Sequence, residues 1–347
     1  YWIANRNLRG SKKQRYMMTA SLKYDIFDWF NVSGRVRVDN ATTDYTDKRY
    51  ASTATLFTSG SPYGFYRTEK GDDRQVYADL LGNINKSFGD FTLNANIGVS
   101  ISQVYNDLEG FQGGLKEISN VFNKYNVNYN LSSDNRPIDE SYKQRTNSIF
   151  ASAELGWRSM LYLTITGRND WDSALANTPS SSFFYPSVGL SAVITEMVKL
   201  PEAISYLKVR GSFASVGSAI PRNLTSKWRY EWDEATNKWV ANKFRPIGKL
   251  YPEKTDSWEA GLSAKFLQNK FSLDLTWYKS NTRKQTLQVP ISTSSGYSSM
   301  YVQSGNVENK GIELGVGFNN SWGQFNWTSN LTFSMNKNKI KELLDDY

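Results

Sequence analysis

A strict two-residue alternation of apolar and polar side chains is the feature that most constrains the fold of this chain. From Phe91 to Ser102, apolar residues occupy one face of an extended segment, and Thr, Asn, Gly and Ser occupy the other. A period of two belongs to a β-strand, and no helix has it. The run is longer than the ~5–6 residues usual in soluble sheets, and it matches the ~9–11 residues of a tilted transmembrane strand.

The same unit recurs and predicts an all-β fold of about twelve strands in six antiparallel hairpins. Five hairpin turns are expected to be short, at about 25–29, 89–90, 158–160, 268–270 and 319–324, while 195–204 is longer and is expected to hold a helical turn. The expected links between hairpins are longer, at about 43–74, 106–141, 171–182, 216–256 and 286–305. This rhythm is typical of outer-membrane barrels, whose short turns are periplasmic and whose long loops are extracellular.

Aromatic residues crowd the short turns. Trp29, Phe88, Phe91, Trp157 and Phe271 are examples in a chain with 11 Trp, 21 Tyr and 18 Phe. Amphipathic rings at strand ends form the girdle of a membrane barrel at the lipid headgroups. A soluble β-sandwich also alternates, but it has no reason to repeat this placement. The sequence therefore favours an antiparallel transmembrane β-barrel over a sandwich.

Composition excludes several classes of function. The chain has no cysteine and no histidine, which removes disulfides, thiolate metal sites, Ser-His-Asp and Cys-His catalysis and the usual zinc ligands. Its net charge of +8 comes from 41 Lys and Arg mixed with 33 Asp and Glu. That mixture favours a solvated or lipopolysaccharide-facing surface over a nucleic-acid partner. An acid pair such as Asp170 with Asp172 is a weak candidate for glycosidase chemistry, and we expect no enzyme.

The polar faces of the predicted strands carry charged residues of both signs. If the apolar faces meet lipid, these side chains line the lumen, as a neutral wall network or as a polar corridor that docks an internal plug. The expected lumen-facing residues are Arg35, Arg37, Asp39, Glu154, Arg168, Asp170, Lys208, Arg210 and Asp274, with Glu259, Lys265 and Glu313 on the same faces.

Two groups of loop residues are candidate binding sites. Trp228, Tyr230, Trp232 and Trp239 are predicted to bind substrate, because exposed aromatics beside polar groups stack on sugar rings and also suit peptides. The alternative is that they pack their own loop. Oxygen atoms of Asp134, Asn135, Asp139 and Glu140 are a weak candidate for Ca²⁺, since their spacing fits no EF-hand loop. No other cofactor is expected.

Several stretches resemble a known family, in the family's order. They are GRNDWDSAL at 167–175, FFYPSVGLSAVI at 183–194, YLKVRGSFASVG at 206–217, PEKTDSWEAGL at 252–262 and NVENKGIELGV at 306–316. They are similar to the barrel of SusC/RagA-type TonB-dependent outer-membrane transporters of Bacteroidetes. The resemblance covers at least Leu161 to Asn336, and its motifs are mostly structural, so no catalytic or ligand residue is carried over.

The resemblance implies a multi-pass protein of the outer membrane that imports oligosaccharides or oligopeptides. It implies a 22-stranded barrel around an N-terminal plug, a SusD-like surface lipoprotein as a lid, energy from the TonB-ExbB-ExbD complex, and a dimer of transporter–lid pairs. The chain departs from that pattern, with no recognisable plug, no TonB box and too few strands, so we expect residues 1–347 to be a partial barrel. The alternative is an outer-membrane adhesin or binding barrel that moves nothing.

Overall fold

The computed structural model describes residues 5–130, 135–176, 178–218, 224, 230–233, 238–241, 244–245 and 251–343. Twelve long strands dominate it: β1 (Asn7–Phe27), β2 (Phe30–Tyr50), β3 (Gly64–Phe88), β4 (Phe91–Gly114), β5 (Arg136–Trp157), β6 (Leu161–Asp172), β7 (Ser182–Val193), β8 (Ile204–Ser218), β12 (Glu253–Phe266), β13 (Phe271–Pro290), β14 (Ser299–Trp322) and β15 (Phe325–Glu342). Shorter elements are η1 (Thr55–Phe57), η2 (Lys124–Asn126), η3 (Ser173–Leu175), α2 (Ile194–Met197), β9 (Tyr230–Asp233), β10 (Lys238–Ala241), β11 (Phe244–Arg245) and η4 (Thr293–Ser295). No helix among the described residues has the length and apolar character to span a membrane.

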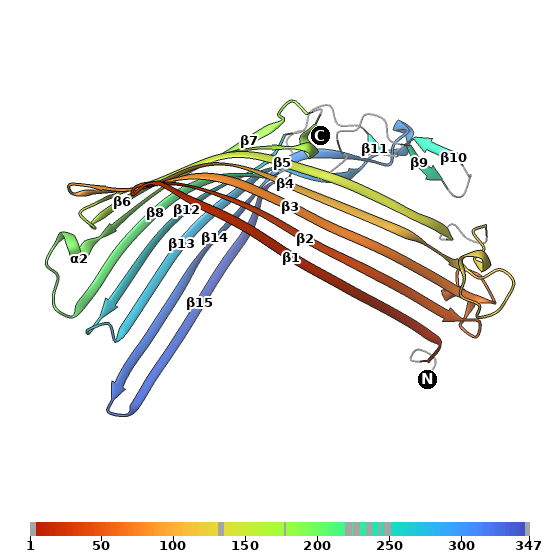
Figure 1. Ribbon diagram of the computed structural model, residues 1–347, viewed down its shortest axis with the longest axis horizontal. Coiled ribbons are helices and arrows are strands. Elements are labelled where there is room, and N and C mark those ends of the chain that lie inside the picture. Colours follow the sequence, from red (N-terminus) through yellow and green to blue (C-terminus); the bar gives the residue numbers. More distant parts are fainter. Residues whose placement is uncertain are drawn as a thin grey trace.

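The long strands form one sheet in which each strand pairs antiparallel with its neighbour in the chain. The order runs from β1 to β8 and continues through β12, β13, β14 and β15, while β11 adds a short parallel pairing to β14 and β9 pairs only with β10. The sheet curves into an arch, with β1 and β15 at its two edges (Figure 1). The predicted antiparallel barrel architecture is thus confirmed, as a curved wall of twelve long strands.

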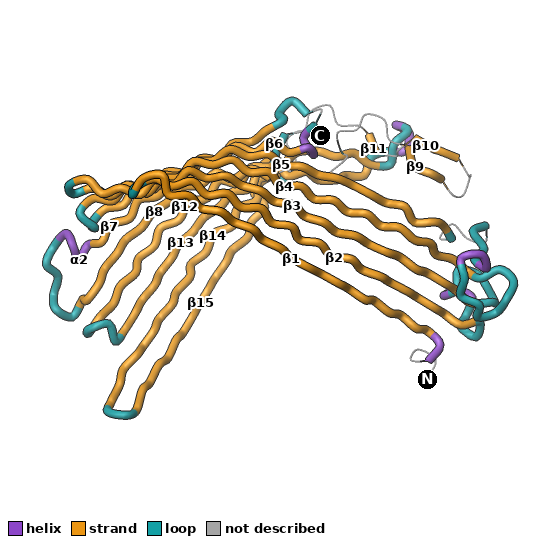
Figure 2. Tube along the Cα trace, in the orientation of Figure 1, coloured by secondary structure: helices purple, strands orange, loops and turns teal. Residues whose placement is uncertain are grey.

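The short turns lie at one end of the arch and the longer connections lie at the other (Figure 2). Residues 89–90 and 158–160 separate strands as expected, and α2 supplies the helical turn expected in the link from β7 to β8. Gly89 and Gly323 have φ of +56° and +61°, a region that glycine enters without strain. Because β14 continues to Trp322, its turn is shorter than the expected 319–324.

Several strands are longer than the alternation predicts. The links expected at 43–74, 106–141 and 286–305 shrink to 51–63, 115–135 and 291–298, because β2 to β5, β13 and β14 continue beyond the alternating segments. Beyond the bilayer both faces of a strand meet water, so backbone pairing persists without an apolar face. The expected links 171–182 and 216–256 agree closely with 173–181 and 219–252.

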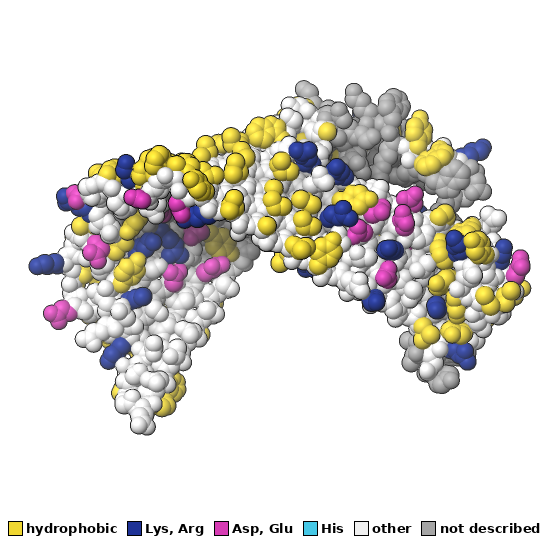
Figure 3. Space-filling view, in the orientation of Figure 1, with side chains coloured by type: hydrophobic (Ala, Val, Ile, Leu, Met, Phe, Trp, Pro, Cys, Tyr) yellow, Lys and Arg dark blue, Asp and Glu magenta, His cyan; other side chains and the backbone are white. Residues whose placement is uncertain are grey.

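Exposure distinguishes the two faces of the sheet. Side chains converge on the concave face of a curved single sheet and diverge on the convex face. Asp79, Ser100, Ser148 and Asp170 are buried although polar, whereas Ile97 is 60% exposed although apolar. Figure 3 shows hydrophobic side chains over the outer surface of the arch and charged side chains gathered in the hollow beneath it. In a soluble protein apolar side chains are buried and polar side chains are exposed. This sheet has the opposite distribution, so its convex outer face meets lipid.

The apolar outer band has the height of a membrane barrel. On β4 it runs from Phe91 to Ile101, and at ~3.3 Å per residue and a tilt of 35–45° it covers about 25 Å, the expected height of the apolar belt. β3 and β4 have 25 and 24 residues, whereas β6 and β7 have 12 each. The wall therefore rises above the bilayer at β2–β4 and is lower at β6–β7.

Residues 51–63 and 115–130 pack together over the tall part of the wall, and we call them the loop cap. Leu115 and Val127 are 1% and 3% exposed. The Ser61 hydroxyl donates to the Leu115 carbonyl at 2.5 Å, and the Ala51 amide donates to Asn120 Oδ1 at 2.7 Å. These contacts join the β2–β3 connection to the β4–β5 connection, so the two links form one small folded body.

Candidate functional site

All nine residues predicted to line the lumen lie on the concave inner face of the sheet. Strand register shows this directly, because Arg35 pairs with Asp79, Asp79 with Ser100, Ser100 with Ser148, and Ser148 with Asp170. The remaining members of the set alternate in phase with this row along their own strands. The inner face is therefore a continuous polar surface from β1 to β14.

The first cluster on this face crosses strands β5, β6 and β7. The Arg168 guanidinium donates to Ser148 Oγ at 2.8 Å and to Asp170 Oδ1 at 2.7 Å. The Tyr185 hydroxyl donates to the second oxygen of Asp170 at 2.9 Å. A parallel contact joins Arg35 to buried Asp79 at 2.7 Å. Each buried carboxylate thus has charge-assisted partners, as burial requires.

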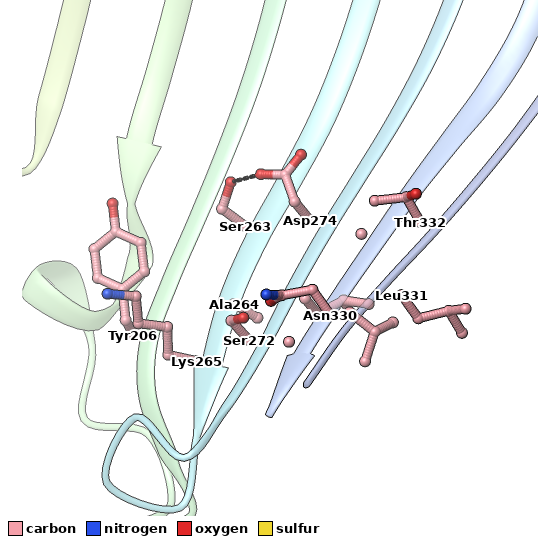
Figure 4. Close-up of a pocket in the computed structure, with 13 residues that line it drawn as sticks. Tyr206, Ser263, Ala264, Lys265, Ser272, Asp274, Asn330, Leu331 and Thr332 are labelled. Atoms are coloured by element: carbon pink, nitrogen blue, oxygen red, sulfur yellow. Dashed lines mark hydrogen bonds between the residues drawn. The ribbon is translucent and has the colours of Figure 1, made fainter. Parts of the chain in front are cut away.

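The second cluster centres on Arg210 of β8. Its guanidinium donates to Ser263 Oγ at 3.0 Å, to Asp274 at 3.2 Å and to Thr276 Oγ1 at 2.6 Å. Ser263 also donates to Asp274 at 2.6 Å, the bond drawn in Figure 4. Gly261 makes room for this arrangement, since a Cβ atom there would lie 2.6 Å from the Arg210 guanidinium.

A hollow of about 380 Å³ opens beside the second cluster, near the short-turn end of the wall. Figure 4 shows Tyr206 and Lys265 on one side of it and Asn330 and Thr332 on the other. Its floor includes Gly315 and Gly317, which pair with Asp274 and Ser272 on β13. Two glycines on the inner face remove side chains that would otherwise fill this space. The hollow is a recess in a polar wall, open to the lumen.

The other predicted wall residues are paired unevenly. Asp39 accepts from Arg15 at 2.8 Å, and Thr164 donates to Glu154 at 3.4 Å. Arg37 and Lys208 have no ion pair among the described residues. Within that same part of the chain, no buried side-chain nitrogen or oxygen lacks a hydrogen-bond partner. Within the described residues, ion pairs therefore neutralise much of this face, but they leave Arg37 and Lys208 without an acidic partner.

The acid pair considered for hydrolysis has structural roles. Asp170 is held by Arg168 and Tyr185 as described. Asp172 caps the 3-10 helix η3, since its Oδ1 accepts from the Ala174 amide at 2.7 Å, and it also accepts from Thr146 at 2.7 Å. Neither carboxylate is placed as a free acid or nucleophile, which a glycosidase pair needs.

The predicted loop aromatics form part of a separate hairpin. Trp232 of β9 pairs directly with Trp239 of β10, and Tyr230 pairs with Ala241. Tyr230 and Trp239 are 56% and 67% exposed. Trp228 lies outside the described residues. The hairpin therefore presents at least two exposed rings beyond the wall, close together in register.

The candidate calcium ligands do not converge. The Asn135 side chain bonds within the loop, accepting from the Gly114 amide and donating to the Asn128 carbonyl. Asp139 and Glu140 are consecutive in β5 and so point to opposite faces of the sheet. Asp134 lies outside the described residues, and within those described no group of three acidic side chains could hold a metal ion.

Sequence reasoning missed Asp79, Tyr185 and the glycine-floored hollow. Asp79 shares the polar phase of its strand, so register with Arg35 was the signal that could have found it. Gly315 and Gly317 occupy inward positions between apolar Leu314, Val316 and Phe318. Two glycines in the same phase were the available sign of a recess.

Replacing Arg210 with methionine should destabilise the wall by about 1–2 kcal/mol, since Asp274 and Glu259 then lose their nearest cation. Lys208→Met on the same strand and face is the control, and it should cost under about 0.5 kcal/mol. Urea unfolding of the full-length protein in lipid vesicles measures both changes in the free energy of unfolding. Equal costs would contradict the assigned network.

Comparison with known proteins agrees with this architecture. The family described as TonB dependent receptor-like, beta-barrel matches residues 1–346. TonB-dependent receptors P3 and P26 of Formosa agariphila are 27% and 28% identical over 75% and 56% of this chain. The aligned regions make up 27% and 20% of those receptors, so the chain spans about a quarter of their length.

Solved structures show the same fold. The RagAB peptide transporter is similar with a TM-score of 0.83 at 19% identity, over 98% of this chain and 38% of that one. The ferric-catecholate import receptor Fiu of E. coli K12 has a TM-score of 0.60 at 13% identity, over 97% and 48%. The SusC/RagA resemblance seen in the motifs is thus confirmed. The chain belongs to the TonB-dependent receptor-like β-barrel family, and it forms a stretch of barrel wall in the outer membrane.

Proposed function

We propose that the transporter containing this wall imports oligosaccharides or oligopeptides across the outer membrane, with energy delivered by TonB-ExbB-ExbD. The observation that carries this is the continuous polar inner face of an arch whose edge strands β1 and β15 remain unpaired with each other. About eight strands already close a barrel filled by side chains, whereas barrels of 22 strands need a plug. Twelve long strands that do not close on each other therefore belong to a wide barrel. The lumen of a wide barrel has room for bulky cargo and requires gating.

Three further components belong to the proposal. A SusD-like surface lipoprotein closes the mouth at the long-loop end, a plug occupies the lumen, and two transporter–lid pairs form the complete assembly. The low stretch of wall at β6 and β7 and the high stretch at β2–β4 give the mouth an uneven rim. The RagAB transporter, described as a peptide importer, supports the oligopeptide alternative through its shared fold. The exposed rings of Tyr230 and Trp239 suit a glycan equally well.

The wall performs no chemistry in this proposal. Its buried carboxylates Asp79, Asp170 and Asp172 are all held by arginine, hydroxyl, amide or backbone donors. Such a surface offers hydrogen bonds to a passing polar cargo without trapping it. The inner hollow beside Asp274 provides space at the short-turn end, where the plug has to move when the channel opens.

Uptake of labelled oligosaccharides and oligopeptides by cells with the full-length transporter tests the function. We expect uptake that stops when a protonophore collapses the proton-motive force, while binding at the cell surface persists. Binding without energy-dependent uptake would instead identify an adhesin. Hydrolysis of the label without uptake would identify an enzyme.

Replacing both Tyr230 and Trp239 with alanine should weaken capture of the cargo about ten-fold, because exposed aromatic anchors contribute heavily to binding. The control is Tyr125→Ala in the loop cap, where the ring is 74% exposed. Equilibrium binding of each cargo class to the purified transporter gives the measurement. An equal loss in the control would refute a specific role for the hairpin.

A further inference from the structure

Three lysines stand in register on the convex, lipid-facing side of the wall. Lys279 of β13 pairs directly with Lys310 of β14, and Lys310 pairs directly with Lys337 of β15. All three share the phase of outward-facing Trp277, Ile312 and Met335 on their strands. Directly opposed side chains of neighbouring strands have Cβ atoms about 4.5–5.5 Å apart, and like charges there destabilise the sheet.

This row lies at the upper rim of the apolar band. Outward residues of β14 are apolar from Phe318 to Ile312, and Lys310 is the next one. The eight-residue step from Phe318 to Lys310 covers about 20 Å at the usual rise and tilt. Trp258 pairs with Lys279, and Trp277 lies two residues below it; both indoles are outward and exposed. Tryptophan marks the membrane interface, so the lysines stand at headgroup depth.

Among the described residues, a neighbouring carboxylate pairs with only one lysine of the row, Lys279. Glu308, one outward position above Lys310, lies 3.2 Å from Lys279 and 3.5 Å from Lys341. Lys310, Lys337 and Lys339 form no ion pair within the described part of the chain. Glu342 ends β15 beyond them. We call Lys279, Lys310, Lys337, Lys339 and Lys341 the outer lysine patch.

The opposite edge of the arch shows that the patch is a local feature. On β1 to β4, Lys12 pairs with Asp44, Asp44 with Lys70, and Lys70 with Glu109. These residues also face outward, above the exposed ring of Tyr16. Their signs alternate across the strands, as cross-strand stability favours. Outward charges on neighbouring strands are therefore opposite in sign at the β1–β4 edge. At the β13–β15 edge, lysine lies opposite lysine.

We propose that the outer lysine patch binds the phosphorylated headgroup of a glycolipid in the outer leaflet. Short turns of outer-membrane barrels face the periplasm, so the patch at the far end of these strands faces the outer leaflet. A phosphate between Lys310 and Lys337 converts their repulsion into two charge-assisted contacts. The adjacent indoles of Trp258 and Trp277 lie against the sugar and upper acyl region of the same lipid.

The test compares two double variants of the full-length transporter in detergent. Lys310→Gln with Lys337→Gln removes two charges from the patch, and Lys12→Gln with Lys70→Gln removes two charges from the balanced row. Native mass spectrometry measures binding of diphosphoryl lipid A, of its dephosphorylated form, and of inorganic phosphate. The patch variant should bind diphosphoryl lipid A about 25-fold more weakly, at about five-fold per lysine, and the control variant should bind normally.

Stability without lipid gives a second readout. The patch variant should unfold at the same temperature as the wild type or higher, because glutamine removes the repulsion between Lys310 and Lys337. The proposal is overturned if both variants lose lipid equally, if dephosphorylated lipid A binds as well as the phosphorylated form, or if inorganic phosphate competes at equal concentration. Normal lipid binding by the patch variant together with loss of an acidic partner protein would also overturn it.

Discussion

Replacing Ile97 with arginine is expected to destabilise the folded protein by about 2–4 kcal/mol. Ile97 lies on the outer face, 60% exposed, roughly midway between the girdle residue Phe91 and the upper end of the apolar band. An arginine there enters hydrocarbon near the bilayer midplane, where transmembrane barrels incur costs of this size. Urea unfolding of the full-length protein in lipid vesicles measures the change in the free energy of unfolding.

The neighbouring position supplies the control. Asn96 faces the lumen, and its amide donates to Ser152 Oγ at 2.8 Å. Asn96→Arg loses that bond but places the charge in a hydrated interior, so it should cost under about 1 kcal/mol. Equal costs at positions 96 and 97 would mean that the two faces are assigned wrongly, and the proposed transport path would fail with them.

Replacing Leu115 with alanine should open the loop cap. Leu115 is 1% exposed, and truncation of a fully buried leucine costs about 2–5 kcal/mol. The loss is local, because the paired strands below the cap do not depend on it. Hydrogen exchange should therefore accelerate at the Lys116 and Asn128 amides, which donate to the Asn126 and Gly114 carbonyls, while amides in the membrane-spanning part of β4 stay protected.

Leu56 provides a matched comparison in the same cap, since it is 85% exposed. Leu56→Ala should leave the exchange of both amides unchanged. If Leu115→Ala leaves exchange as slow as this control does, the two connections are not packed as one body.

The features that could be predicted best from the sequence are those that the bilayer imposes on the membrane-spanning strands. Lipid against one face and water against the other force the alternation from Phe91 to Ser102, and both the strand and its faces follow from it. The two-residue turn at 89–90 and the helical turn after β7 were predictable for similar local reasons. Above the bilayer the strands have water on both faces, and the alternation disappears. The upper part of β2, which continues to Tyr50, could therefore not be predicted as a strand from its residue pattern.

The candidate site was predictable only in part. The alternation placed Arg168, Asp170, Arg210 and Asp274 on one face, but their contacts depend on strand register across the sheet. Arg210 reaches Asp274 across an intervening strand because Gly261 lies between them without a side chain. Such a contact joins residues far apart in the sequence, so the alternation within a single strand cannot predict it.

The connectivity of the sheet also has a consequence for how the wall assembles. Almost every strand pairs with the one made just before it, so most pairings close only a short segment of chain. The pairing of β8 with β12 must first enclose residues 219–252. Loop closure loses more entropy as the enclosed segment lengthens, and such distant pairings slow folding. We therefore expect β1–β8 and β12–β15 to form two separate sheets first. Pairing of β8 with β12 should then be the slow step of folding.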